Sequence, residues 1–107
     1  MSNKIIYNKL VRDKIPLIIA DAGKEYEIHT AEDAEYLEKL LDKVEEELEE
    51  FREEPSIKEM ADIYEVLDAL VDYFDFDKQE ILSFQKKKRK NRGGFKERII
   101  LDKVIED

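Results

Sequence analysis

The sequence contains no cysteine, one histidine, three glycines and two prolines among its 107 residues. Without cysteine, the protein has no disulfides, no zinc–thiolate sites and no cysteine nucleophile. With His29 as the only imidazole, it also has no histidine metal cluster. No apolar run is long enough to span a membrane, and nothing resembles a signal peptide. We therefore expect a cytoplasmic protein that has no membrane partner.

Charged side chains, in contrast, are abundant. The chain has 28 acidic and 19 basic residues and a formal net charge of −9. This charge would repel the phosphate backbone of a nucleic acid, so we expect no stable nucleic-acid partner. A small phosphorylated ligand remains compatible, because a divalent cation can mediate its contact with acidic side chains. Hydrophobic residues make up 42% of the chain, which is typical of a folded domain and not of a disordered tail.

The apolar residues follow helical spacing in four stretches. Their intervals of three and four predict helices over about residues 15–22, 30–54, 56–74 and 77–92. Asp13, Thr30 and Ser56 are the expected N-caps of the first three, and Gly23 and Gly93 are expected helix stops. We predict short strands at residues 5–7, at residues 24–29 and in the isoleucine-rich tail after Gly94. The expected fold is one all-α domain over residues 1–107, a bundle of about four helices with minor short terminal strands.

The two central helices have predicted inner faces made of apolar residues only. In the second helix these are Leu37, Leu40, Leu41, Val44, Leu48 and Phe51, and in the third they are Met60, Ile63, Leu67, Leu70, Val71 and Phe74. Four short helices form a shallow core, and we therefore expect a homodimer or a larger homo-oligomer.

Two pairs of carboxylates lie beside these apolar faces. Glu47 and Glu50 are three residues apart, as are Glu59 and Asp62. At about 100° per residue, each pair has one carboxylate at the edge of the apolar stripe and the other one turn further out. If the two helices pack antiparallel, the pairs can converge on one rim. Oxygen ligands without sulfur or imidazole favour Mg²⁺ or Mn²⁺, and the neighbouring Glu46 can orient an attacking water.

A simpler interpretation of these acids is also open. Glutamate is a good helix former, so the acids of the second helix can be plain solvated surface. Glu59 has a structural explanation of its own, as the capping-box partner of Ser56.

Three segments resemble a known family. The sequence KVEEELEEF (residues 43–51) followed by EMADI (residues 59–63) resembles the E-E-x-x-E…E-x-x-D signature of the MazG-like, all-α NTP pyrophosphohydrolases. The sequences YNKLVRDKIP (residues 7–16) and RGGFKERI (residues 92–99) are similar to the two ends of a small single-domain branch described as house-cleaning nucleotide pyrophosphatases. The resemblance thus touches the beginning, the middle and the end of the chain, and implies a MazG-like helical bundle.

The resemblance also implies an activity and roles for individual residues. It implies hydrolysis of a canonical or non-canonical nucleoside triphosphate to the monophosphate and pyrophosphate, with water attacking the α-phosphorus. It assigns Mg²⁺ to Glu47, Glu50, Glu59 and Asp62, with Glu46 assisting. We expect the basic residues Lys9, Arg12 and Arg92 to hold the triphosphate.

Two alternative functions remain open. The same superfamily contains phosphoribosyl-ATP pyrophosphohydrolase, so the substrate can be that nucleotide or another pyrophosphate-linked metabolite. In the other alternative, the chain is a non-catalytic helical interaction module whose acidic rim binds a basic partner. That module would show no specific binding of a divalent ion.

Overall fold

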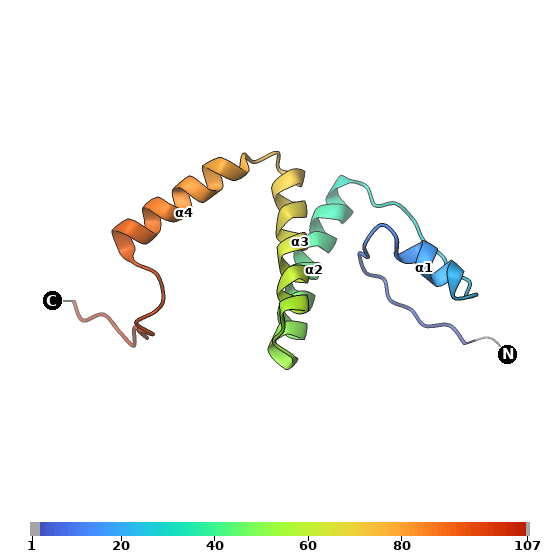
Figure 1. The fold of residues 1–107 in the computed structure, drawn as a ribbon, viewed down its shortest axis with the longest axis horizontal. Helices are drawn as coiled ribbons and strands as arrows, with labels where there is room; N and C mark the ends of the chain where they lie inside the picture. The colour runs from blue at the N-terminus through green and yellow to red at the C-terminus, as the bar shows by residue number, and fades with distance from the viewer. Residues whose placement is uncertain (1–2, 107) are drawn as a thin grey trace. The chain divides into compact units, whose positions relative to one another are not determined.

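The computed structural model describes residues 3–106, which form four α-helices and no strand. The helices are α1 (Ile15–Asp21), α2 (Asp33–Glu53), α3 (Ile57–Tyr73) and α4 (Lys78–Arg92) (Figure 1). The chain divides into two compact units, Met1–Phe74 and Asp75–Asp107. The predicted all-α class is confirmed. The MazG-like arrangement of the bundle and the single domain over residues 1–107 stay predictions.

The predicted short strands are wrong for the described part of the chain. A strand needs a neighbouring segment to pair with its N–H and C=O groups. In residues 3–106, no backbone hydrogen bond joins residues 5–7 or 99–105 to any other segment, and residues 24–29 make only one, from Lys24 N to Ile19 O, which closes the end of α1. The isoleucine-rich composition reflects a preference for extended backbone, but it does not supply a partner strand.

The helix ends are set by local chemistry that is partly visible in the sequence. Ser56 Oγ accepts a hydrogen bond from Glu59 N at 3.1 Å, as the capping-box pattern predicts. Asp77 caps α4 in the same way, accepting a hydrogen bond from Gln79 N at 2.8 Å. The predicted caps Asp13 and Thr30 are wrong, because the residues that precede α1 and α2 are Lys14 and Glu32, neither of which makes a side-chain cap bond.

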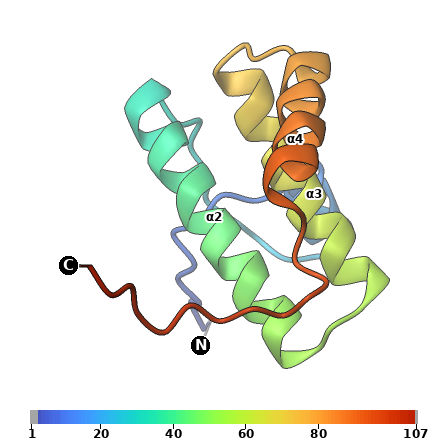
Figure 2. The ribbon, with the colours of Figure 1, turned by 90° about the vertical axis from the view of Figure 1, so that its left-hand side faces the viewer.

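Helices α2 and α3 form an antiparallel hairpin and lie side by side in both ribbon views (Figures 1 and 2). The side chains buried in the hairpin are Leu40, Ile63 and Val66, together with the carboxylate residue Glu47. The seam therefore runs through one acidic position of α2 as well as through apolar ones.

The predicted inner faces are only partly correct. Leu41 and Leu48 of α2 are 50% and 51% exposed, and Leu67 of α3 is 45% exposed. Both helices are rotated about their axes so that the seam lies nearer to the acidic side than the apolar stripe indicated. Which side of a helix becomes buried depends on the segments that pack against it. The sequence of a single helix does not contain that information.

A segment before α1, residues 8–12, packs on this hairpin and is called the N-terminal segment below. Leu10 and Val11 are half-buried, and Lys39 Nζ of α2 donates a hydrogen bond to the Asn8 carbonyl at 2.8 Å. Asn8 has φ = 47°, a left-handed conformation that asparagine tolerates better than most residues. The segment contacts both helices, since Lys9 reaches Glu46 of α2 and Arg12 reaches Asp62 of α3.

The second unit contains α4, which has no buried residue. The helix ends at Arg92, where the sequence predicts a stop, and Gly93 follows with φ = 83°, a positive value that glycine adopts more readily than other residues. Across residues 3–106, no helix combines the length and the apolar character needed to cross a membrane.

Candidate metal centre

Three of the four predicted metal ligands come together where the acidic end of α2 faces the first turns of α3. Glu47, Glu50 and Glu59 each offer a carboxylate oxygen, and these oxygens all lie within 4.8 Å of one another. We call these residues the glutamate triplet. Two of them are one turn apart on α2, and the capped start of α3 supplies the third. The antiparallel hairpin therefore brings residues from both predicted pairs to one place.

Glu47 is the buried member of the triplet. It is 6% exposed, and its Oε2 atom has no hydrogen-bond partner. Its Oε1 atom lies 3.6 Å from Lys43 Nζ, one turn earlier on α2. Oε2 of the half-buried Glu59 also lacks a partner. Buried carboxylate oxygens without a hydrogen bond are costly, because they lose water and gain nothing in its place.

Two members of the triplet have raised pKa values. Burial raises the pKa of Glu47 above its ordinary value, and the neighbouring Glu50 raises that pKa further. Burial and the charge of Glu50 also raise the pKa of Glu59. Like charges at this distance favour the protonated form unless a cation lies among them. A bound divalent ion would reverse this preference by stabilising the ionised carboxylates.

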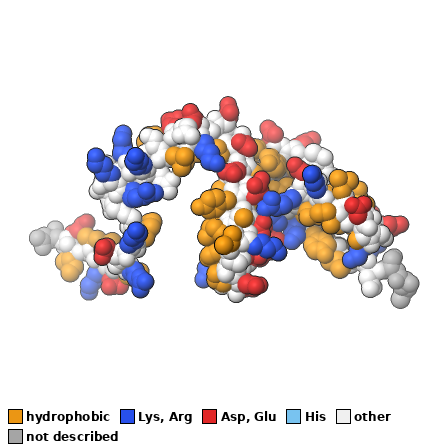
Figure 3. Space-filling model, viewed as in Figure 1, with side chains coloured by type: hydrophobic (Ala, Val, Ile, Leu, Met, Phe, Trp, Pro, Cys, Tyr) orange, Lys and Arg blue, Asp and Glu red, His pale blue; other side chains and the backbone are white. Residues whose placement is uncertain are grey.

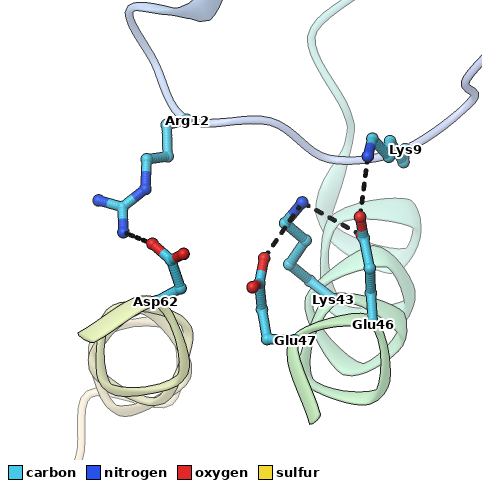
Figure 4. Close-up of polar contacts among 6 residues, drawn as sticks. All are labelled: Lys9, Arg12, Lys43, Glu46, Glu47 and Asp62. Carbon is cyan, nitrogen blue, oxygen red and sulfur yellow. Dashed lines mark hydrogen bonds and ion pairs between the residues drawn. The ribbon is translucent and has the colours of Figure 1, made fainter. Parts of the chain in front are cut away.

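Asp62, the fourth predicted ligand, lies beside the triplet but does not join it. Its Oδ1 atom is 2.7 Å from Nη2 of Arg12 in the N-terminal segment (Figure 4). Its negative charge still contributes to the raised pKa values of Glu47 and Glu59. Arg12, which the sequence predicts to hold a triphosphate, thus forms an ion pair with Asp62, a predicted metal ligand of the same chain.

Glu46 is also held by cations. Lys9 Nζ lies 2.8 Å from one carboxylate oxygen and Lys43 Nζ lies 3.1 Å from the other (Figure 4). Partial burial acts to raise the pKa of Glu46, but the two lysines outweigh it and the pKa is lowered. The hydrogen bond to Glu46 in turn raises the pKa of Lys9. Glu46 is therefore an ionised carboxylate beside the triplet, which is compatible with the predicted role of orienting a water.

The sequence interpretation missed Lys43. This lysine contacts both Glu46 and Glu47, and its side chain is only 15% exposed. The signal was present in the sequence, because residues three and four apart on a helix are neighbours. Lys43 and Lys9 also line a cavity of about 150 Å³ between α2 and the N-terminal segment, together with Asn8, Leu10, Lys39, Asp42 and Glu46.

Arg92, the third predicted substrate residue, lies at the end of α4 in the second unit. It lies beside Phe84, Lys88 and Asn91 along one side of that helix. Its predicted role toward the acidic cluster stays a prediction.

The donor set fits a hard divalent cation. The triplet offers carboxylate oxygens from two helices, and two of those carboxylates have an oxygen that no protein group satisfies. Mg²⁺ and Mn²⁺ prefer such ligands and keep several waters when they bind. Glu47, Glu50 and Glu59 are therefore the residues that would hold the ion.

No family model, no curated protein and no solved structure matches this chain. The resemblance of three segments to the MazG-like pyrophosphohydrolases therefore stays a prediction from the sequence. Support for a function comes from the geometry of the glutamate triplet and of the cations around it.

Proposed function

We propose that the protein is a Mg²⁺-dependent nucleotide pyrophosphohydrolase, with Mn²⁺ as an alternative ion. The observation that carries the proposal is the glutamate triplet, whose oxygens lie within 4.8 Å of one another and whose most buried member has an unpartnered oxygen. Ordinary surface glutamates extend into water and keep their hydration. Glu47 is only 6% exposed, so its carboxylate has lost most of its hydration. A bound cation would compensate for that loss.

The surrounding residues suit hydrolysis of a phosphoanhydride. When bound, the divalent ion would supply neutralisation of the phosphate charge that builds up during attack by water. Glu46 is ionised and can accept a hydrogen bond from the attacking water. Lys9 and Arg12 bring positive charge to the same rim, where a polyphosphate needs it. The chain has no cysteine, so direct attack by water agrees with its composition better than a thiol nucleophile does.

The test is release of pyrophosphate from a panel of canonical and modified nucleoside triphosphates in the presence of Mg²⁺ or Mn²⁺. We expect activity in the wild type and a loss of about 100-fold or more in Glu47→Gln and Glu59→Gln, because each substitution removes a charged ligand. Glu45→Gln is the matched control, since Glu45 is an exposed glutamate of α2 outside the triplet. Circular dichroism of each variant checks that the helices are retained.

The order of activities across the panel distinguishes the possible substrates. Preference for phosphoribosyl-ATP or for another pyrophosphate-linked metabolite would keep the reaction and change its substrate. Absence of hydrolysis with every compound, together with no divalent-ion binding by calorimetry, would reject the proposed function. The non-catalytic helical interaction module would then account for the acidic rim.

A second copy of the chain is the partner we propose alongside the substrate. Helix α3 carries apolar residues at intervals of three and four that are well exposed in the single chain, namely Ile57, Met60, Tyr64 and Leu67. Hydrophobic side chains gather along the α2–α3 pair in the space-filling view (Figure 3). Contiguous apolar surface of this kind is typical of a protein–protein interface.

A further inference from the structure

Arg12 and Asp62 form an ion pair that joins the N-terminal segment to α3 across the edge of the glutamate triplet. The Arg12 side chain is 55% exposed, whereas that of Asp62 is 26% exposed. In Figure 4 the guanidinium reaches down to the Asp62 carboxylate, and the Glu47 carboxylate lies between α2 and α3 beside that pair. The arginine is therefore accessible to a ligand from solvent, while its partner carboxylate faces the metal centre.

In the paired conformation, Asp62 stays apart from the triplet. Asp62 lies close enough to affect the pKa values of Glu47 and Glu59, yet it does not belong to the group of oxygens that lie within 4.8 Å of one another. For Asp62 to bind the same cation, its carboxylate has to move toward the triplet, and this movement draws Oδ1 away from Nη2 of Arg12. For Arg12 to bind a phosphate through both of its Nη atoms, Nη2 has to leave Asp62.

We propose that Arg12 and Asp62 exchange partners when the site is loaded. An anionic phosphate takes Arg12, and the released Asp62 becomes the fourth carboxylate of the metal centre. This inference rests on the proposed function and adds a mechanism of regulation to it. The ion pair holds the metal centre in a three-carboxylate form of lower affinity until the anion arrives.

The exchange makes metal binding and anion binding cooperative. A ligand that binds alone either leaves the Arg12–Asp62 pair closed and makes fewer contacts, or has to open the pair, whereas the second ligand to bind finds the pair already open. Because coupling between two ligands is reciprocal, the anion must increase the affinity for the metal by the same factor as the metal increases the affinity for the anion.

Calorimetric titration of the full chain with Mn²⁺, with and without sulfate as a tetrahedral dianion, tests the exchange. Arg12→Gln frees Asp62 permanently. We therefore expect this variant to bind Mn²⁺ about three- to tenfold more tightly than the wild type when sulfate is absent. This range follows from the modest strength of a half-exposed ion pair and from the removal of one positive charge. We expect sulfate to increase the Mn²⁺ affinity of the wild type by about threefold or more, and that of Arg12→Gln by much less.

Two control variants separate partner exchange from a general charge effect. Lys58→Gln removes a cation whose charge acts on Glu59 but which makes no ion pair with Asp62. We expect Lys58→Gln to change the Mn²⁺ affinity by less than about twofold, as a solvent-screened charge does. In an Asp62→Asn background, Arg12→Gln should change the Mn²⁺ affinity by no more than Lys58→Gln changes it in the wild type.

The outcomes distinguish this inference from the proposed function. If the wild type binds Mn²⁺ but Arg12→Gln binds it no more tightly than Lys58→Gln does, the exchange is rejected and the metal site stands. The same conclusion follows if Arg12→Gln increases the Mn²⁺ affinity equally in the wild type and in the Asp62→Asn background. If neither the wild type nor any of the variants binds Mn²⁺, the metal site is rejected and the exchange with it.

Discussion

Glu47 combines two properties that are unfavourable for folding. Its carboxylate is buried in the α2–α3 seam, and one of its oxygens has no hydrogen-bond partner. An apolar residue in this position would extend the small core, so the acid weakens the hairpin where a hydrophobic side chain would strengthen it. Residues that disagree with their local environment in this way concentrate at functional sites.

The pH dependence of stability should reveal this cost in the metal-free protein. The pKa of Glu47 is raised from its ordinary value of 4.5, through burial first and then through Glu50 and Asp62, while Lys43 opposes the shift. Between 4.5 and the raised pKa the folded state binds more protons than the unfolded state, so stability falls as pH rises through this window. Saturating Mg²⁺ should remove much of the loss above the window, because it stabilises the ionised form.

Thermal unfolding from pH 4 to pH 7.5, with and without Mg²⁺, measures this effect. Glu47→Gln should show a smaller fall in Tm across the window and a smaller gain from Mg²⁺. Glu46 provides the contrast, because its pKa is lowered. Its contribution to stability is present above its ordinary value of 4.5 and is lost as pH falls from that value through the lowered pKa. An equal fall in Tm for the wild type and Glu47→Gln would contradict the assignment of a buried, unsatisfied carboxylate.

At the scale of elements, the start of α3 serves both the fold and the site. Ser56 accepts a hydrogen bond from the backbone N–H of Glu59, which fixes the first turn of the helix. The side chain of Glu59 is then free of the reciprocal capping bond and belongs to the glutamate triplet. The capping-box interpretation and the metal-ligand interpretation therefore describe different atoms of one residue.

Ser56→Ala should destabilise the protein by about 1 kcal/mol, because it leaves a helix N–H without its cap. The expected fall in Tm is about 4–8 °C for a domain of this size. Mn²⁺ affinity should fall as well, since the first turn that presents Glu59 becomes less ordered.

Ser83→Ala is the control for this prediction, because Ser83 lies exposed inside α4 and alanine is the better helix former there. Thermal unfolding and calorimetry measure both variants. A Ser56→Ala protein with unchanged Tm would show that the cap contributes nothing to the hairpin.

At the scale of the whole molecule, the α2–α3 hairpin buries few hydrophobic side chains of its own. In the described residues, the buried hydrophobic side chains are Leu40, Ile63 and Val66. Apolar side chains on α3 stay in contact with solvent, among them Tyr64, which is 64% exposed, and Leu67, which is 45% exposed. A standard interface covers about 800 Å² on each partner, and a second copy that packs on this stripe would remove it from water.

We therefore predict that the mass in solution is at least twice the 12.7 kDa of one chain. Analytical ultracentrifugation at micromolar concentration measures this mass. Leu67→Lys places a charge on the exposed stripe of α3 and should weaken association by about tenfold or more.

Glu65→Lys is the control, since it places a lysine at an exposed residue of α3 outside the stripe and changes the net charge by more than Leu67→Lys does. A wild-type chain that sediments as a monomer would remove the proposed second copy. Association that Leu67→Lys leaves unchanged would move the interface to another face.

Local patterns in the sequence were sufficient for the helices. The spacing of apolar residues, the Ser56 cap and the stop at Gly93 act within a few residues of each other, and the four helices begin and end within three residues of the predicted bounds. The capping interaction at Asp77 is local in the same sense. The strands failed because pairing requires a distant segment, and no preference of residues 99–105 can supply one.

Tertiary structure decided which acids act together. The sequence placed Glu47, Glu50, Glu59 and Asp62 on equivalent edges of two helices, and this spacing predicts a set of four. Rotation of the helices about their axes, and the path of the N-terminal segment through Asn8, brought three of them together and paired the fourth with Arg12, fifty residues away. A contact over that separation depends on tertiary structure, because it forms only when the N-terminal segment packs on the α2–α3 hairpin.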